Sequence, residues 1–405
     1  MSIESFTTAA VEVGSAEWYE FVAEIGRDAE DRVKNDRNPF DQIDLVRRVG
    51  FGAATLPVAD GGQGLNVREL LRAVIELAGA DSYVPHILRS HFWQVNRILR
   101  WTSGSERARW IDQIRAGKIF GNANTEKGAR PVGAPVWATR VSPDGDNYRV
   151  SGEKFYSTGT LFADWITVSC QFDDDTLSEI VVPADRAGVQ IIDDWDGIGQ
   201  SRTGSGTTIL DNVLVYPHEV LHLSAVTADP PAGSVDDTFV QLYLQALIAG
   251  VLRSVVADSI GLIGSRARSF SHATTEKPSD DPVLHEVVGR IASTAFVAEA
   301  SVLTAADLVD EAYSAEARGD ASVEAYRRAA LAAAHVKVHV DAAALSAATN
   351  LFEVGGASAA SRDKNLDRHW RNIRTISLHN PIAYKAVQVG NTLINGEALP
   401  TNGYF

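Results

Sequence analysis

The sequence is poor in cysteine and has fewer basic than acidic residues. Cys170 is the only cysteine among 405 residues, so an intrachain disulfide and a cysteine-built zinc site are both excluded. A single thiol suits a reducing compartment, and we expect a cytoplasmic protein. With 37 Lys and Arg against 52 Asp and Glu, the formal net charge is −15. No basic stripe is available for a nucleic acid to bind.

Signals for targeting, membrane insertion and dinucleotide binding are also missing. Residues 1–13 have neither a basic nor a strongly apolar segment, so no signal peptide is expected. Polar residues interrupt the most apolar stretch, 238–264, which therefore predicts a buried core helix and no membrane span. No G-x-G-x-x-G follows a strand pattern, so a nicotinamide site within the chain is not expected.

The periodicity of apolar residues changes twice along the chain. Residues 1–118 carry helical spacing, as in "VRELLRAVIELAGA". Residues 119–235 hold short segments rich in β-branched residues and punctuated by Gly, Pro and Asp, which predict a small β domain. Residues 236–405 return to long, alanine-rich helical patterns, which are typical of a four-helix bundle whose last helix starts near Asp363.

Five motifs occur in an order that resembles the acyl-CoA dehydrogenase superfamily. They are "VGFGAATLPVADGGQGL" (49–65), "GNANTE" (121–126), "VSGEKFYSTG" (150–159), "DNVLVYPHEVL" (211–221) and "LFEVGGASAASRDKNLDRHWRN" (351–372). Two further stretches, "DDWDGIGQSRTGSGTT" (193–208) and "RHWRNIRTISLHNP" (368–381), resemble its flavin-dependent monooxygenase branch, typified by dibenzothiophene monooxygenase.

The resemblance implies an α+β fold with an N-terminal helical domain, a central β barrel and a C-terminal four-helix bundle. It also implies a homotetramer that holds flavin between the β domain, the bundle and a neighbouring subunit. The implied activity is that of a two-component monooxygenase. A separate NAD(P)H:flavin reductase supplies reduced FMN, with FAD as the alternative. Oxygen then forms a C4a-hydroperoxide that oxygenates a small heteroaromatic, sulfur- or nitrogen-containing substrate.

The β domain contains most of the side chains that the resemblance places near the flavin. Short polar and aromatic side chains suit the edge and the face of a flavin ring. Tyr156 and Thr158 are expected on one face of a strand. Taken without the resemblance, these segments equally describe polar turns, a strand edge and a flexible loop. The candidates are Asn122, Asn124, Thr125, Tyr156, Thr158, Trp195 and Ser205.

Three more flavin contacts are implied in the bundle. The family places an arginine like Arg268 against a flavin phosphate, usually across a subunit interface, and guanidinium geometry suits phosphate oxygens. The alternative for Arg268 is a solvated cation at a helix end. Gly355 and Gly356 match a glycine pair close to the cofactor, although such a pair also caps a helix.

Two histidines are candidates for proton chemistry, together with Asn122, which the resemblance places near the oxygen site. His379 lies in "SLHNP", where acyl-CoA dehydrogenases commonly carry "YEGT", and no carboxylate occurs between Asp367 and Glu397. His91 lies near a position where the related monooxygenases keep a histidine, although a lone helix histidine usually has a structural role. The related enzymes have another histidine where this chain has Ile376, which makes the site less polar and puts the same substrate in doubt.

Three alternatives remain open from the sequence. An acyl-CoA dehydrogenase would bind FAD and would need Glu299 or Glu353 as its base. An amino-sugar N-oxygenase would use the same flavin chemistry on nitrogen. A helical binding protein that has lost its flavin would need none of these residues.

Overall fold

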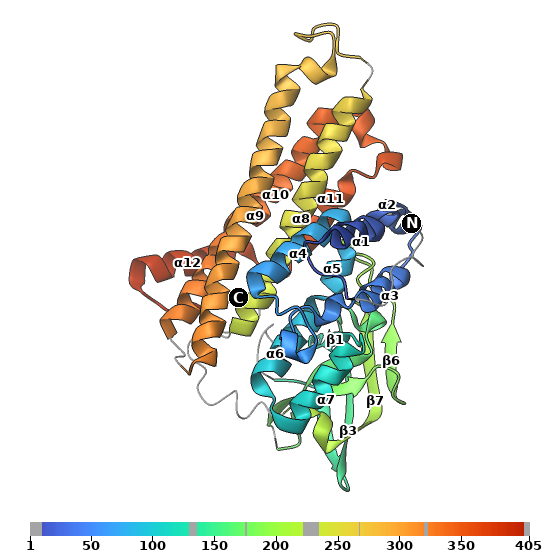
Figure 1. Ribbon diagram of the computed structural model, residues 1–405, viewed down its shortest axis with the longest axis vertical. Coiled ribbons are helices and arrows are strands. Elements are labelled where there is room, and N and C mark those ends of the chain that lie inside the picture. Colours follow the sequence, from blue (N-terminus) through green and yellow to red (C-terminus); the bar gives the residue numbers. More distant parts are fainter. Residues whose placement is uncertain are drawn as a thin grey trace.

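A computed structural model describes residues 10–128, 136–174, 176–221, 235–266, 268–319 and 323–400. A long helical bundle stands on a β sheet, and the N-terminal helices fill the space between them (Figure 1). A capping box between Asn66 and Glu69 starts the amphipathic helix α4. The N-terminal helices are α1 (Ala16–Gly26), α2 (Ala29–Lys34), α3 (Phe40–Arg48), α4 (Val67–Ala80), α5 (Tyr83–Ile87), α6 (Arg89–Trp101) and α7 (Gly104–Arg115).

The middle of the chain, where a β barrel was expected, forms one mixed, eight-stranded sheet. Its path is β6-β7-β3-β2-β4-β5-β8, with β1 paired in parallel to β4. Alternating apolar residues of these strands form a separate core, which includes Val150, Val168 and Val213. The strands are β1 (Phe120–Ala123), β2 (Arg140–Asp144), β3 (Asn147–Lys154), β4 (Trp165–Phe172), β5 (Leu177–Pro183), β6 (Val189–Ile192), β7 (Thr207–Val215) and β8 (Val220–Leu221).

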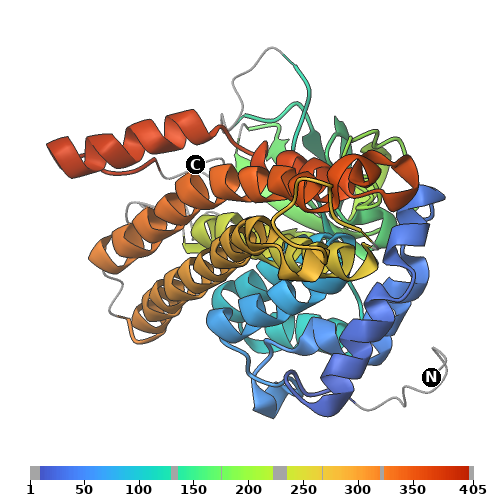
Figure 2. The same ribbon diagram turned by 90° about the horizontal axis from the view of Figure 1, so that it is seen from above.

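The C-terminal bundle is built on three long helices, α8 (Val235–Ser265), α9 (Pro282–Ala317) and α10 (Val323–Gly355). The last helix was expected to start near Asp363. It begins instead at Asp367 and is divided into α11 (Asp367–Ser377) and α12 (Ile382–Asn395), which corrects that expectation. Pro381, the N-cap of α12, cannot donate a helical hydrogen bond, so the chain turns at 378–381. From there α12 extends outward and packs against α10 (Figure 2).

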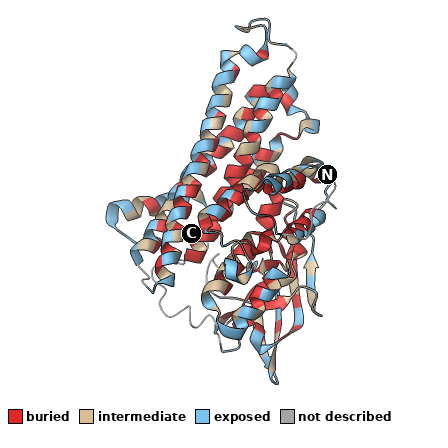
Figure 3. Cartoon of the chain, viewed as in Figure 1, coloured by how far each residue is buried: buried red, intermediate tan, exposed pale blue. Residues whose placement is uncertain are grey.

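Helix α8 is the centre of the main hydrophobic core. It packs against α4, α9, α10 and α11, and most of its side chains are buried along its first two-thirds (Figure 3). By length and composition alone, α8 and α9 could each cross a membrane. Core helices of bundles share that composition, so length and composition do not distinguish a core helix from a membrane span. The expected buried core helix at 238–264 is confirmed.

Candidate functional site

Gln200 joins three parts of the chain in the described structure. Its side chain is buried and its backbone is left-handed, with φ of 52°. Its Nε2 donates to Ser82 Oγ at 2.8 Å, just before α5, and its backbone N–H donates to Asn372 Oδ1 of α11 at 2.9 Å. Its backbone oxygen accepts from Trp195 Nε1 and from Thr203 Oγ1, each at 2.8 Å. The 193–206 loop is therefore held against α5 and α11.

His86, in α5, is the fifth residue that Gln200 contacts. Its Nδ1 lies 2.8 Å from Gln200 Oε1. An amide oxygen only accepts hydrogen bonds, so Nδ1 carries the proton and Nε2 keeps a lone pair. Burial and the charge of Arg89 lower the pKa of His86 to about 4. His86 is consequently a neutral hydrogen-bond acceptor at physiological pH, and the sequence analysis did not select it.

His379 lies in the turn between α11 and α12, next to Arg89. Arg89 Nη2 is 3.4 Å from His379 Nε2, and a guanidinium only donates, so Nε2 accepts. The ring keeps water-accessible surface although protein surrounds it. Desolvation, followed by the charges of Arg89 and Lys337, lowers the pKa of His379 well below its usual range, and His86 is close enough to contribute. The structure thus brings His379 and His86 into the same electrostatic environment.

His91 has a different environment from His86 and His379, and its catalytic role stays a prediction. It is fully buried in α6. Its Nε2 lies 2.8 Å from the backbone oxygen of Gly52 and therefore donates, while its Nδ1 accepts from the Phe120 N–H at 3.3 Å. Burial lowers its pKa to about 4. With both ring nitrogens engaged in this structure, His91 connects α6 to β1 and to the 51–53 turn.

Asn122 in β1 meets the same end of α6. Its Oδ1 accepts a hydrogen bond from Ser90 Oγ, the residue after Arg89. Asn124 instead accepts from Ser169 Oγ of β4 at 3.0 Å, and its backbone oxygen lies 3.3 Å from Lys154 Nζ. Thr125 pairs with Phe155 through an isolated bridge. Asn122 is thus the member of this group that is hydrogen-bonded to the α6 segment carrying Arg89.

Tyr156 and Thr158 do not share the face of a strand as expected, because β3 ends at Lys154. Tyr156 is left-handed, with φ of 55°, and the Thr158 N–H donates to its backbone oxygen at 2.9 Å. This turn directs Tyr156 edge-on to Trp195, with ring centroids 5.8 Å apart. Thr158 Oγ1 meets Ser205 Oγ at 2.9 Å, and Ser205 Oγ meets Thr203 Oγ1 at 2.8 Å. Both interactions lead back to Gln200.

The three candidates in the bundle lie elsewhere. Arg268 is exposed and lies in the segment that follows α8. The C-terminal end of α8 is at the end of the bundle far from the sheet (Figure 1). Gly355 ends α10, where an added Cβ would come within 2.6 Å of Ala359 Cβ, and Gly356 has φ of 61°. Arg266 Nη1 donates to Val354 O at 2.8 Å, so these two segments meet. The described contacts do not connect them to Gln200 or His379 within one chain.

The carboxylates that a dehydrogenase would need have other surroundings. Glu299 in α9 forms a two-point ion pair with Arg253 of α8, at 2.6 and 2.8 Å. Glu353 is exposed near the end of α10. Within the described residues, neither glutamate forms a hydrogen bond or ion pair with His86 or His379. Neither is therefore placed as a base beside these histidines.

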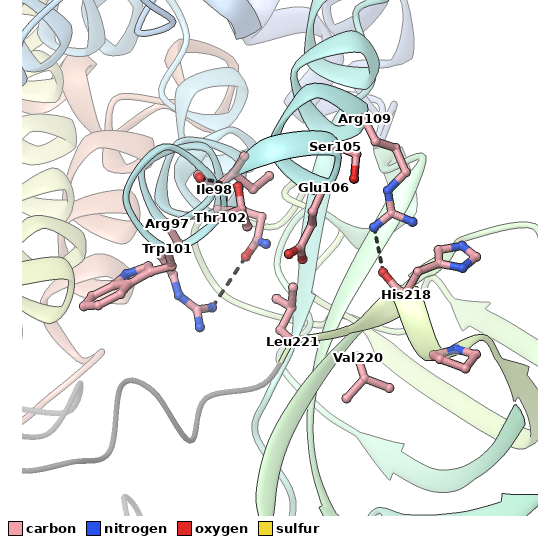
Figure 4. A pocket seen from close by; sticks show the side chains of 12 residues that line it. Arg97, Ile98, Trp101, Thr102, Ser105, Glu106, Arg109, His218, Val220 and Leu221 are labelled. Atoms are coloured by element: carbon pink, nitrogen blue, oxygen red, sulfur yellow. Dashed lines mark hydrogen bonds between the residues drawn. The ribbon is translucent and has the colours of Figure 1, made fainter.

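A cavity of about 630 Å³ lies between α6, α7 and the 217–221 segment (Figure 4). Arg109 crosses its mouth and donates to the His218 backbone oxygen at 2.6 Å, and Arg97 and Trp101 form its other side. None of the sequence-predicted residues lines it. It is therefore separate from the His86–His379 region.

Comparisons with known proteins agree with this architecture. The N-terminal, middle and C-terminal domains of the acyl-CoA dehydrogenase family match residues 15–118, 122–213 and 242–384. Dibenzothiophene monooxygenase of Mycolicibacterium goodii is 29% identical, over 92% of this chain and 91% of that protein.

Two solved structures are also similar. TdsC from Paenibacillus sp. A11-2, solved with FMN and indole, is 28% identical with a TM-score of 0.89, covering 96% of this chain and 98% of that one. Methanesulfinate monooxygenase MsuC from Pseudomonas fluorescens is 25% identical with a TM-score of 0.88, covering 98% of this chain and 100% of that one. With three family domains matched in order, the chain belongs to the acyl-CoA dehydrogenase superfamily and within it is similar to monooxygenases.

Proposed function

We propose that the protein is a reduced-flavin-dependent monooxygenase that oxygenates a small sulfur-containing, nitrogen-containing or aromatic substrate. The observation that carries the proposal is the pair of neutral imidazoles, His86 and His379. The charge of Arg89 lowers the pKa of both. His379 stands where the family resemblance places the dehydrogenase glutamate. The relatives named as monooxygenases, and the TdsC structure with FMN and indole, support the same activity.

The residues beside Gln200 fit a flavin, and we propose FMN because TdsC was solved with it. Tyr156 is 54% exposed and Trp195 is half-buried, so two aromatic side chains present surface that a flat ring could cover. Thr158, Ser205 and Asn122 supply hydroxyl and amide groups for the polar edge of such a ring. When bound, reduced FMN supplies the two electrons that activate O2 for transfer of one oxygen atom.

The chain's own contribution is to place protons and to exclude water. His86 presents a lone pair on Nε2, because Gln200 holds the proton on Nδ1. His379 accepts from Arg89 at Nε2 and so carries its own proton on Nδ1. An acceptor and a donor near one substrate can take up and return a proton during oxygen transfer. His86 is buried, whereas His379 keeps accessible surface that bound flavin and substrate would have to cover to limit loss of hydrogen peroxide to water.

We propose that a separate NAD(P)H:flavin reductase supplies the reduced flavin. The sequence holds no dinucleotide fingerprint after a strand. When protein, oxidised FMN and NADPH or NADH are mixed anaerobically, the 450 nm flavin absorbance should stay constant, as in a protein-free control. Addition of a flavin reductase should bleach it, and oxygen with substrate should then yield product. Bleaching by the protein alone would contradict a two-component system.

We also propose a homotetramer in which α12 packs on a neighbour. Among the side chains of α12, the exposed ones include Tyr384 at 73%, Leu393 at 65% and Ile394 at 82%, and such a patch marks an association surface. Arg268 would then contact flavin across an interface. Light scattering should give about four times 43.6 kDa. Ile394→Glu should lower this mass, whereas Asn395→Glu on the same helix should not. A wild-type monomer that binds FMN fully would contradict the proposal.

A further inference from the structure

Arg89 occupies a distinctive position, as the first residue of α6. It follows His86 by three residues, and its neighbour Ser90 donates to Asn122. Its Nη2 lies 3.4 Å from His379 Nε2. The side chain is only partly buried. A guanidinium with accessible surface therefore stands where α5, α6, β1 and the 378–381 turn come together.

Arg89 brings a permanent positive charge to this region. A guanidinium stays protonated at all working pH values. Lys337 and Lys385 also lower the pKa of His379, but Asp341 pairs with Lys337, and burial lowers the pKa of Lys385 to about 7. Lys337 Nζ is held by Asp341 Oδ2 at 2.6 Å and by the Ser377 backbone oxygen at 3.1 Å, directly before the His379 turn. His86 and His379 are neutral, so they neither add to this charge nor compensate it.

We propose that Arg89 binds the anionic group of the substrate, and that the substrate is a small organic acid with a sulfinate or carboxylate group. This inference rests on the proposed oxygenase function. Both groups present two oxygens that match the fork of a guanidinium. A partly desolvated pair of this kind is stronger than one in water. A neutral aromatic substrate such as a thiophene would not use this charge. The position of Arg89 therefore favours an anionic substrate over a neutral one.

The test is a calorimetric titration with two matched pairs of probes, benzenesulfinate with methyl phenyl sulfone and benzoate with benzamide. Each is titrated into wild type, Arg89→Gln, Arg89→Lys and the control Arg290→Gln, with and without oxidised FMN. Arg290 is an exposed helix cation, 76% accessible. Loss of a charge-assisted contact should weaken binding of the anions by about 10- to 100-fold in Arg89→Gln. Arg89→Lys should recover part of the affinity, and the neutral probes and the control should be unchanged.

Several results would overturn the inference. These are anion affinity unchanged in Arg89→Gln, equal losses for the neutral probes, failure of wild type to bind either anion at millimolar concentration, or a loss of FMN affinity with anion binding intact. Thermal unfolding of each variant shows whether it is folded, and Arg89→Lys provides a second variant if Arg89→Gln is not.

The proposed function is tested separately by incorporation of oxygen from labelled O2, with a reductase and FMN present. Incorporation into neutral compounds only, at equal rates in wild type and Arg89→Gln, would leave an oxygenase and remove the role of Arg89. Arg89-dependent anion binding with no incorporation into any compound would leave the anion site and remove the oxygenase.

Discussion

Replacement of His379 by alanine should lower the rate of product formation by about 100- to 10,000-fold, the usual contribution of a general acid or base. Most of the oxygen consumed should then appear as hydrogen peroxide. Arg89 keeps its position in α6, and the aromatic and hydroxyl groups near Gln200 are untouched, so affinity for FMN should change little. The measurement is product and peroxide formed per reduced FMN consumed. His335→Ala, an exposed histidine of α10, is the matched control.

A purely structural role for His379 predicts a different result. The turn that carries it is already held by Lys337 at the Ser377 oxygen and by Asn380 Nδ2, which donates to Gln241 Oε1 at 3.0 Å. If His379 only stabilised this turn, the variant would unfold at lower temperature while each folded molecule kept wild-type coupling of oxygen to product. A folded His379→Ala protein with unchanged product and peroxide yields removes His379 from the catalytic residues.

Replacement of Gln200 by glutamate should change the pH dependence of the reaction more than its maximum. In wild type, His86 is neutral until the pH approaches about 4. A carboxylate beside Nδ1 favours the imidazolium, so it should raise the pKa of His86 toward the ordinary range. Protonation removes the lone pair on Nε2. Each unit by which this pKa exceeds the working pH lowers the neutral fraction about 10-fold.

The acid limb of the rate profile should therefore move to higher pH in Gln200→Glu, and activity should be lost in mildly acidic buffer where wild type keeps it. Product formation measured between pH 5 and pH 8 checks this. Gln190→Glu, on the exposed face of β6, adds the same charge elsewhere and should leave the profile unchanged. Gln200→Met separates loss of the hydrogen bond from addition of charge. Superimposable wild-type and Gln200→Glu profiles would show that protonation of His86 does not matter.

The sequence alone was sufficient for the fold class, the family and the position of His379. Helical and strand periodicities differ enough that the helix, sheet and bundle order could be predicted without contacts. The motifs at 121–126 and 150–159 carried the resemblance to the superfamily, and the stretch at 368–381 carried the resemblance to its monooxygenase branch. The absence of a carboxylate between Asp367 and Glu397 is a property of the sequence itself, and it pointed to His379 directly.

Only the tertiary structure showed that the two histidines of "HILRSH" have different surroundings. His86 and His91 are five residues apart on an apolar stretch that reads as one helix. The chain divides at Leu88 into α5 and α6. His91 then packs on Gly52 and Phe120, whereas His86 meets Gln200, which is 114 residues away in sequence. Tautomer and pKa follow from such distant partners.

The same limit applies to Tyr156, Gln200 and Arg89. Tyr156 follows the end of β3 and is itself left-handed, so it departs from the strand pattern. Gln200 was not predicted as a site residue because it is an uncharged residue in a loop, although it contacts α5, α11 and Trp195. The charge that Arg89 places beside His379 comes from a residue 290 positions earlier. Local patterns determine which elements form, while the partners of a buried polar group depend on where those elements pack.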